Sequence, residues 1–195
     1  MDTLIFATNN QHKIDEIRSI PEIKFHIIGL KEAGIDIDIP EPYDTLEENA
    51  TEKSTVIYKL TGLDCFSEDT GLEVEALNGV PGVKSARYAG NGKSFEKNID
   101  KLLLKMKGKE TRNAQFRTIL SLILKGNEYK FEGICKGNIL ADSIGKKGFG
   151  YDPVFLPLES QRTFAEMDME EKNKFSHRKK ATDKMIDFLQ NISKQ

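Results

Sequence analysis

The segment AQFRTILSLILKGNEYKFEGICKGNI, residues 114–139, carries the strongest structural signal of the chain. Two long strand-like runs, residues 114–124 and 129–139, are separated by Gly126 and Asn127, residues that favour a tight turn. The segment therefore predicts a long β-hairpin and a fold that contains a sheet.

Shorter elements surround the hairpin. On its N-terminal side, residues 3–8 and 24–29 predict strands, and a helix with isoleucines at helical spacing follows the first strand. A capping box of Thr45 and Glu48 predicts a helix over residues 45–60. We expect further strands at residues 64–67 and 153–156, helices at 94–105 and 182–192, and partly helical structure at 163–175. Strands interleaved with helices, together with a hairpin, predict an α/β or α+β protein with a mixed sheet.

Composition limits the class of protein. Hydrophobic residues make up 38% and charged residues 31% of the 195 residues, which is typical of one globular domain, and no repeat or linker divides residues 1–195. The net charge of -2 gives no general attraction to nucleic acid or an anionic membrane. The chain has no apolar stretch of about 20 residues and no secretory signal pattern, so we expect a cytosolic protein. Cys65 and Cys135 lie apart in apolar segments, which predicts reduced core residues and no zinc site.

An acidic pair follows the strand predicted at residues 64–67. Glu68 and Asp69 precede Thr70 and a glycine-rich stretch, and Glu41 lies in a proline-bounded loop. Adjacent carboxylates either form a solvated turn or hold a divalent cation, and Mg²⁺ takes one or two carboxylates together with phosphate oxygens. Asp69 and Glu41 are therefore candidates to hold such an ion and orient a water for attack on phosphorus.

Two lysines are candidate phosphate ligands. Lys13 lies in the first turn of a helix that Asn9 and Asn10 open, where a phosphate would meet backbone N–H groups, although Asn10 could simply cap the helix. Projection at about 100° per residue places Lys53 in the middle of an apolar helix face. It could extend to solvent or reach an anionic cleft. That face consists of Leu46, Ala50, Ile57 and Leu60.

Two further motifs lie near the C-terminus. In GFGYDP, residues 148–153, Phe149 or Tyr151 could stack on a base or fill the core. Beyond it, Lys172, His177 and Arg178 belong to a basic run at a predicted helix start, where the helix dipole disfavours positive charge. We therefore expect an anionic or carbonyl-rich partner for this run, with a basic surface patch as the alternative.

Five motifs together resemble one family. They are ATNNQHK, EENATEK, SEDTGLEVEALNGVPGVKSARYAG, GFGYDPVF and TFAEMDMEEKNKFSHRKKA, and their order and spacing resemble the inosine triphosphate pyrophosphatase family over nearly the whole chain. The resemblance implies an α/β fold with a long mixed sheet flanked by helices, two lobes around a central cleft, and a homodimer. It implies Mg²⁺-dependent hydrolysis of ITP, dITP and XTP, in which water attacks the α-phosphorus and releases pyrophosphate.

The resemblance also implies roles for individual residues. Asp69 matches the general base and a metal-site residue, with Glu41 and Glu68 as further metal-site carboxylates. The triphosphate and sugar contacts match Thr8, Asn9, Asn10, Lys13, Lys53 and Thr70. Phe149 matches the residue that stacks on the base. The rest of the purine pocket matches Gly150, Tyr151, Asp152, Lys172, His177 and Arg178.

Three positions depart from the common pattern, and two other functions stay open. In the family that the chain resembles, many bacterial members have Asp at the position of Glu68 and Ser at the position of Thr70. Gly is frequent at the position of Asn9. Whether Glu68 contacts the metal is therefore open. The alternatives are a purine nucleotide sensor without turnover and a pyrophosphatase for modified pyrimidine triphosphates.

Overall fold

The computed structural model describes residues 3–90, 92 and 94–192 of the chain. These residues form two compact units. Unit 1 contains residues 3–69, 118–133 and 178–192, and unit 2 contains residues 70–117 and 134–177. The single domain predicted over residues 1–195 and the cleft between lobes stay predictions, and residues 1–2, 91, 93 and 193–195 lie outside the described part.

A mixed sheet supplies strands to both units. Its order is β2-β1-β3-β5-β6-β7, and β4 pairs with β3 off this path. Strand β1 runs parallel to β2 and β3, whereas β4 is antiparallel to β3 and β7 is antiparallel to β6. The predicted mixed sheet with flanking helices is thus confirmed. The strands are β1 (Thr3–Phe6), β2 (His26–Gly29), β3 (Cys65–Val74), β4 (Pro81–Gly82), β5 (Asn113–Leu124), β6 (Asn127–Ile139) and β7 (Phe155–Pro157).

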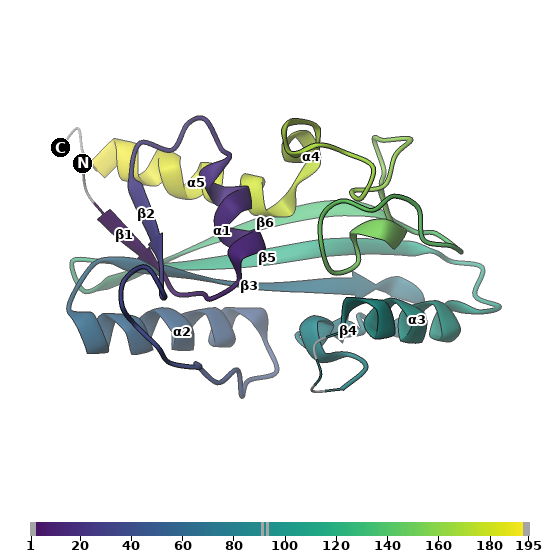
Figure 1. Cartoon of the computed structure of the whole chain (residues 1–195), viewed down its shortest axis with the longest axis horizontal. Coiled ribbons are helices and arrows are strands. Elements are labelled where there is room, and N and C mark those ends of the chain that lie inside the picture. Colours follow the sequence, from purple (N-terminus) through teal and green to yellow (C-terminus); the bar gives the residue numbers. More distant parts are fainter. Residues whose placement is uncertain (1–2, 91, 93, 193–195) are drawn as a thin grey trace. The chain divides into compact units, whose positions relative to one another are not determined.

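In unit 1, helices cover both faces of the sheet (Figure 1). Helices α1 (Gln11–Arg18) and α5 (His177–Ile192) pack on one face, where Phe6 and Phe66 stack with ring centres 4.4 Å apart. Helix α2 (Leu46–Thr61) packs on the other face, over Ile5 and Cys65. Successive strand residues therefore alternate between the α1/α5 face and the α2 face.

Unit 2 has a separate core. It is built on β3, β5 and β7 and on α3 (Phe95–Met106), with Leu72, Leu102 and Phe155 buried in it. Helix α4 (Met169–Phe175) also belongs to this unit. The remaining elements in residues 3–90, 92 and 94–192 are the single-turn 3₁₀ helices Glu75–Leu77, Ser85–Arg87 and Asp152–Val154. None of the described helices has the length and apolar character that a membrane span requires.

The predicted hairpin and the predicted capping box are present. Strands β5 and β6 are joined by Lys125 and Gly126, whose φ angles of 50° and 83° suit a two-residue turn of type I′, so Asn127 begins β6. The predicted turn was thus one residue too late. At the start of α2, the Glu48 N–H donates to Thr45 Oγ1 at 3.2 Å, as the capping box predicts.

Two other sequence predictions are wrong. The strand expected to end at residue 67 continues, and Glu68 and Asp69 lie inside the ten-residue strand β3. Cations on both faces of the sheet, Lys53 on one and Arg178 on the other, make this burial of charge possible. Leu60, predicted on the apolar face of α2, is 58% exposed, because the buried stripe of this helix stops at Ile57, before its last turn.

Gly71 permits the close approach of β4 to β3 next to the acidic pair. A Cβ atom at this position would lie 2.8 Å from the backbone oxygen of Gly82. We predict that Gly71→Ala lowers the free energy of unfolding by about 1–3 kcal/mol, measured by urea denaturation. Gly92→Ala is the control, since its Cβ would meet no atom of the described residues beyond its chain neighbours within 4 Å. Equal stability of both variants would contradict the steric argument.

Candidate functional site

The two acidic residues of β3 point to opposite faces of the sheet. They are neighbours in a strand, so their side chains alternate. Glu68 lies on the face that α1 and α5 cover, and Asp69 lies on the face that α2 covers. Both are buried, at 2% and 6% exposure. Their charges must therefore be compensated separately.

On the α2 face, Lys53 compensates Asp69. Its ammonium donates to Asp69 Oδ1 at 3.1 Å and to Glu41 Oε1 at 2.7 Å. Burial alone would lower the pKa of Lys53, but Asp69 and Glu41 outweigh this effect and raise it. Of the two interpretations open from sequence, the anionic one is confirmed, since Lys53 is buried rather than extended to solvent.

The second oxygen of Asp69 is unusual. Oδ2 is buried and accepts no hydrogen bond from any residue that the structure describes. Burial, the largest cause, and the nearby Glu41 carboxylate raise the pKa of Asp69, and Lys53 and Lys13 only partly offset them. An unsatisfied buried carboxylate oxygen costs stability and indicates a position for a water or a cation.

These carboxylates fit a magnesium ion that also binds substrate. In the described part of the chain, no three His, Cys, Asp or Glu side chains lie close enough to hold a metal together. Mg²⁺, however, commonly uses one or two carboxylates and completes its shell with phosphate oxygens and water. Glu41 and Asp69, joined by one ammonium, offer that number of carboxylates. The magnesium ion itself stays a prediction.

On the α1/α5 face, Arg178 and Lys13 compensate Glu68. Arg178 Nε and Nη2 donate to the two oxygens of Glu68 at 2.6 and 2.7 Å, and Lys13 Nζ lies 3.1 Å from Glu68 Oε1. Arg178 Nη1 also donates to Glu16. Burial alone would lower the pKa of Arg178, but Glu68 and Glu16 raise it. The anionic partner expected for the basic helix start is thus confirmed for Arg178.

The predicted phosphate contacts Thr8, Asn9 and Asn10 form a short segment before α1, which we call the phosphate loop. Asn10 caps this helix through the backbone N–H of Lys13, and its own N–H donates to Thr8 Oγ1 at 3.1 Å. The cap interpretation is confirmed, and the cap occupies one of the N-terminal N–H groups of α1, that of Lys13. Thr8 and Asn9 line a hollow of about 570 Å³ between the start of α1 and the loop after β2.

In unit 2, three predicted purine-pocket residues form a charged cluster. Asp152 Oδ2 accepts from Lys172 Nζ at 2.6 Å and from the Phe149 N–H at 2.9 Å. The Lys172 ammonium also lies 5.3 Å from the centre of the Phe149 ring. Gly150, at a φ of 62°, lies inside this turn. The cluster fixes the turn that presents Phe149.

Tyr151 and His177 are more buried than a surface pocket would suggest. The Tyr151 ring is 3% exposed and its hydroxyl donates to the Ser85 carbonyl at 2.9 Å, so this aromatic fills the core. The His177 ring stacks on Phe116 with ring centres 4.7 Å apart. Thr70 follows Asp69 in β3 and is half-buried. The contacts that these three residues make with a nucleotide stay predictions.

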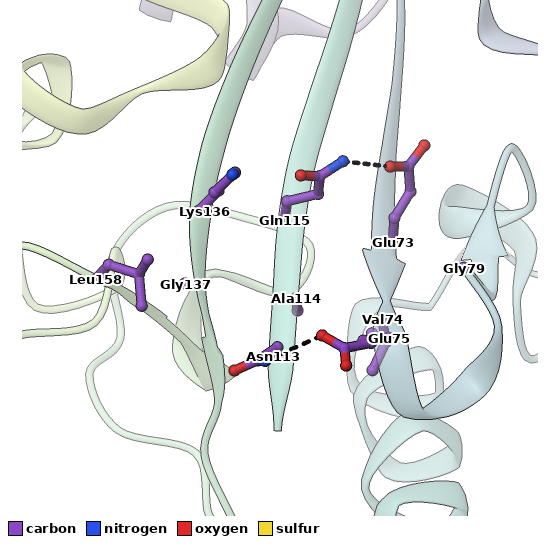
Figure 2. A pocket seen from close by; sticks show the side chains of 10 residues that line it. All are labelled: Glu73, Val74, Glu75, Gly79, Asn113, Ala114, Gln115, Lys136, Gly137 and Leu158. Carbon is purple, nitrogen blue, oxygen red and sulfur yellow. Dashed lines mark hydrogen bonds between the residues drawn. The ribbon is translucent and has the colours of Figure 1, made fainter. Parts of the chain in front are cut away.

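A hollow of about 440 Å³ on unit 2 contains none of the predicted site residues. Figure 2 shows that it lies over β3, β5 and β6, where Gln115 donates to Glu73 and Asn113 donates to Glu75. Its lining mixes polar and apolar residues and includes the exposed Leu158. Hydrogen bonds among the lining side chains distinguish it from the site at Asp69, where an oxygen is left over.

Glu16 is the site residue that the sequence did not reveal. It is 4% exposed and binds Arg178, although 162 residues separate them in the sequence. Its spacing of three residues from Lys13 places both on one side of α1. That spacing and the need for an anionic partner were visible in the sequence, but not which carboxylate would meet the arginine.

A sequence profile of the Ham1 family matches residues 4–188. The chain belongs to the Ham1 family. It is 49% identical to the dITP/XTP pyrophosphatase of Flavobacterium psychrophilum, over 96% of this chain and 99% of that one. It is 50% identical to the dITP/XTP pyrophosphatase of Porphyromonas gingivalis, over 97% and 98% of the two chains.

Solved structures of Ham1 proteins share the fold. The Staphylococcus aureus Ham1 protein superposes with a TM-score of 0.87 at 39% identity, covering 97% of this chain and 99% of that one. The Coxiella burnetii HAM1 protein gives a TM-score of 0.88 at 34% identity, covering 98% and 100%. The Ham1 assignment confirms the family resemblance that the five motifs indicated.

Asp69 should cost stability in a pH-dependent way. Its folded pKa lies above the unfolded value of about 3.9, so the folded state loses stability as pH rises from about 4 through the folded pKa. We predict that Asp69→Asn raises the melting temperature at pH 7, by about 2–4 °C for each kcal/mol that the variant gains in free energy of unfolding. Below pH 4 the melting temperature should equal that of wild type. Asp142→Asn, at an exposed aspartate, is the control. A variant less stable than wild type at pH 7 would contradict this assignment.

Proposed function

We propose that this chain hydrolyses non-standard purine nucleoside triphosphates, namely ITP, dITP and XTP, to the monophosphate and pyrophosphate. The observation that supports the proposal most directly is the buried Oδ2 of Asp69, which lies beside Lys53 and Glu41 and accepts no hydrogen bond from the described residues. Relatives about half identical over nearly their whole length bear the name dITP/XTP pyrophosphatase, which supports this substrate class.

In the proposed reaction, Asp69 is the general base. Oδ2 takes a proton from a water that attacks the α-phosphorus, and pyrophosphate leaves. The raised pKa of Asp69, due first to burial, makes it a better proton acceptor than an exposed aspartate. Lys53 holds Oδ1 and thereby orients the carboxylate. Lys53 and Lys13 supply positive charge to the phosphates.

Glu41 and Asp69 would hold the magnesium ion. When bound, Mg²⁺ neutralises charge on the phosphate oxygens of the substrate. Thr8, Asn9 and Asn10 belong to the phosphate loop in this proposal, because the start of α1 presents backbone N–H groups beside their side chains.

The proposed contacts with the purine base are those that the family resemblance indicates. Phe149 stacks on the base, and Lys172 and Asp152 fix its turn. Gly150, Tyr151, His177 and Thr70 complete the substrate contacts. A guanidinium has only donors, so Arg178 favours the 6-oxo group of inosine or xanthine over the 6-amino group of adenine.

The two alternative functions are less favoured. A sensor without turnover has no use for an unsatisfied carboxylate that costs stability, and the relatives are named as pyrophosphatases. The same names specify inosine and xanthine bases rather than modified pyrimidines. The homodimer and the cytosolic location expected from the sequence stay predictions.

The test is product analysis in ¹⁸O-labelled water. The protein is incubated with Mg²⁺ and, separately, ITP, dITP, XTP, ATP, GTP and a modified pyrimidine triphosphate. We expect turnover of the first three, with the label in the monophosphate and none in pyrophosphate. Label in pyrophosphate, release of inorganic phosphate, or preference for the pyrimidine would each contradict the proposal.

Asp69→Asn tests the base assignment. We expect about 10²–10⁴-fold slower pyrophosphate release from ITP, the range that a general base contributes. ITP binding in EDTA, measured by calorimetry, should persist. Asp142→Asn, which changes an exposed aspartate of unit 2, should match wild type. Unchanged turnover in Asp69→Asn would show that Asp69 is not the general base.

A further inference from the structure

Four charged side chains meet on the α1/α5 face of unit 1. Lys13 and Glu16 come from α1, Glu68 from β3 and Arg178 from α5. The side chains of Glu16, Glu68 and Arg178 are at most 5% exposed, and that of Lys13 is 17% exposed. The cluster balances two negative charges with two positive charges, as burial of ions requires.

Glu68 is the member that joins the others. Its two oxygens receive Nε and Nη2 of Arg178 in a fork, a geometry that fixes the plane of a guanidinium. Oε1 also lies 3.1 Å from the Lys13 ammonium. A single carboxylate therefore sets the spacing between the arginine and the lysine.

Glu16 holds Arg178 from another side. It accepts from Nη1, so Glu16 and Glu68 together restrain the guanidinium at three nitrogen atoms. A long arginine side chain ordinarily loses rotamer freedom when it binds a ligand. Here the protein has ordered Arg178 in advance.

This arrangement disfavours Glu68 as a metal ligand. A magnesium ion bound directly to Glu68 would compete with Arg178 for oxygens that already accept a fork. It would also add positive charge beside Arg178 and Lys13. Asp69, on the opposite face, has the unsatisfied oxygen that Glu68 lacks.

We propose that Glu68, assisted by Glu16, is a positioning residue that holds Arg178 and Lys13 at a fixed spacing and thereby sets discrimination between 6-oxo and 6-amino purines. The proposal rests on the proposed function, in which Arg178 contacts the base and Lys13 the phosphates. The two acidic residues then have different roles: Asp69 takes part in the reaction, and Glu68 contributes to substrate selection.

The test compares Glu68→Gln with wild type in two assays. The first is calorimetric binding of IMP and AMP in EDTA, which needs neither metal nor turnover. We expect the preference for IMP over AMP to fall about ten-fold, as for loss of one charged hydrogen bond. The second is the Mg²⁺ concentration that gives half-maximal ITP turnover, which should stay within about two-fold of wild type, because the proposal places the ion at Glu41 and Asp69.

Further variants separate positioning from support of the fold. Glu68→Asp keeps the charge but shortens the side chain, so it should retain the fold and lose part of the preference. Glu16→Gln should change the preference in the same direction. Glu73→Gln, on the same strand and near Arg117, is the matched control and should change neither assay.

Each other outcome is decisive. A raised Mg²⁺ requirement with unchanged IMP preference would make Glu68 a metal ligand and overturn the proposal. If Glu68→Gln lowers the melting temperature and changes neither assay, the cluster only stabilises the fold, and the proposal is wrong. If wild type does not prefer IMP, base selection by Arg178 fails and this proposal fails with it. If wild type prefers IMP and the variants keep that preference, only this proposal fails.

Discussion

Burial of two adjacent carboxylates in the middle of β3 is the constraint on which the site depends. An ionised carboxylate without a partner is too costly to bury, so each needs a cation on its own face of the sheet. Lys53 of α2 serves Asp69, and Arg178 and Lys13 serve Glu68. The helices on the two faces are thus fixed by charge as well as by their apolar contacts.

The carboxylates of Glu68 and Asp69 differ in how completely they are hydrogen-bonded, and the proposed function depends on this difference. Glu68 has partners at both oxygens, whereas Asp69 keeps one buried oxygen without a hydrogen bond from the described residues. The complete set suits a fixed framework, and the incomplete one suits a group that must accept a proton. A buried carboxylate with a raised pKa and an unsatisfied oxygen is typical of active sites, where stability is lower than it could be.

Local sequence patterns predicted most helices and strands. They did not predict which charged residues, distant in the sequence, form ion pairs. The capping box at Thr45 and the hairpin before β6 are set by neighbouring residues, so the sequence sufficed. The continuation of β3 was missed because acidic residues are rare in strands unless cations meet them. Lys53 lies 16 residues from Asp69 in the sequence, and Arg178 lies 110 residues from Glu68. Helical projection placed Lys53 on the correct face, but only the fold showed what it contacts.

The most direct test of this account is a double-mutant cycle between Glu68 and Arg178 in urea unfolding. Glu68→Gln and Arg178→Gln each leave a buried charge without its fork, and the double variant removes both charges together. The account predicts that the double variant loses less stability than the two single losses combined, by about 1–3 kcal/mol. Additivity within about 0.5 kcal/mol would mean that the two side chains do not depend on each other, and would contradict the account.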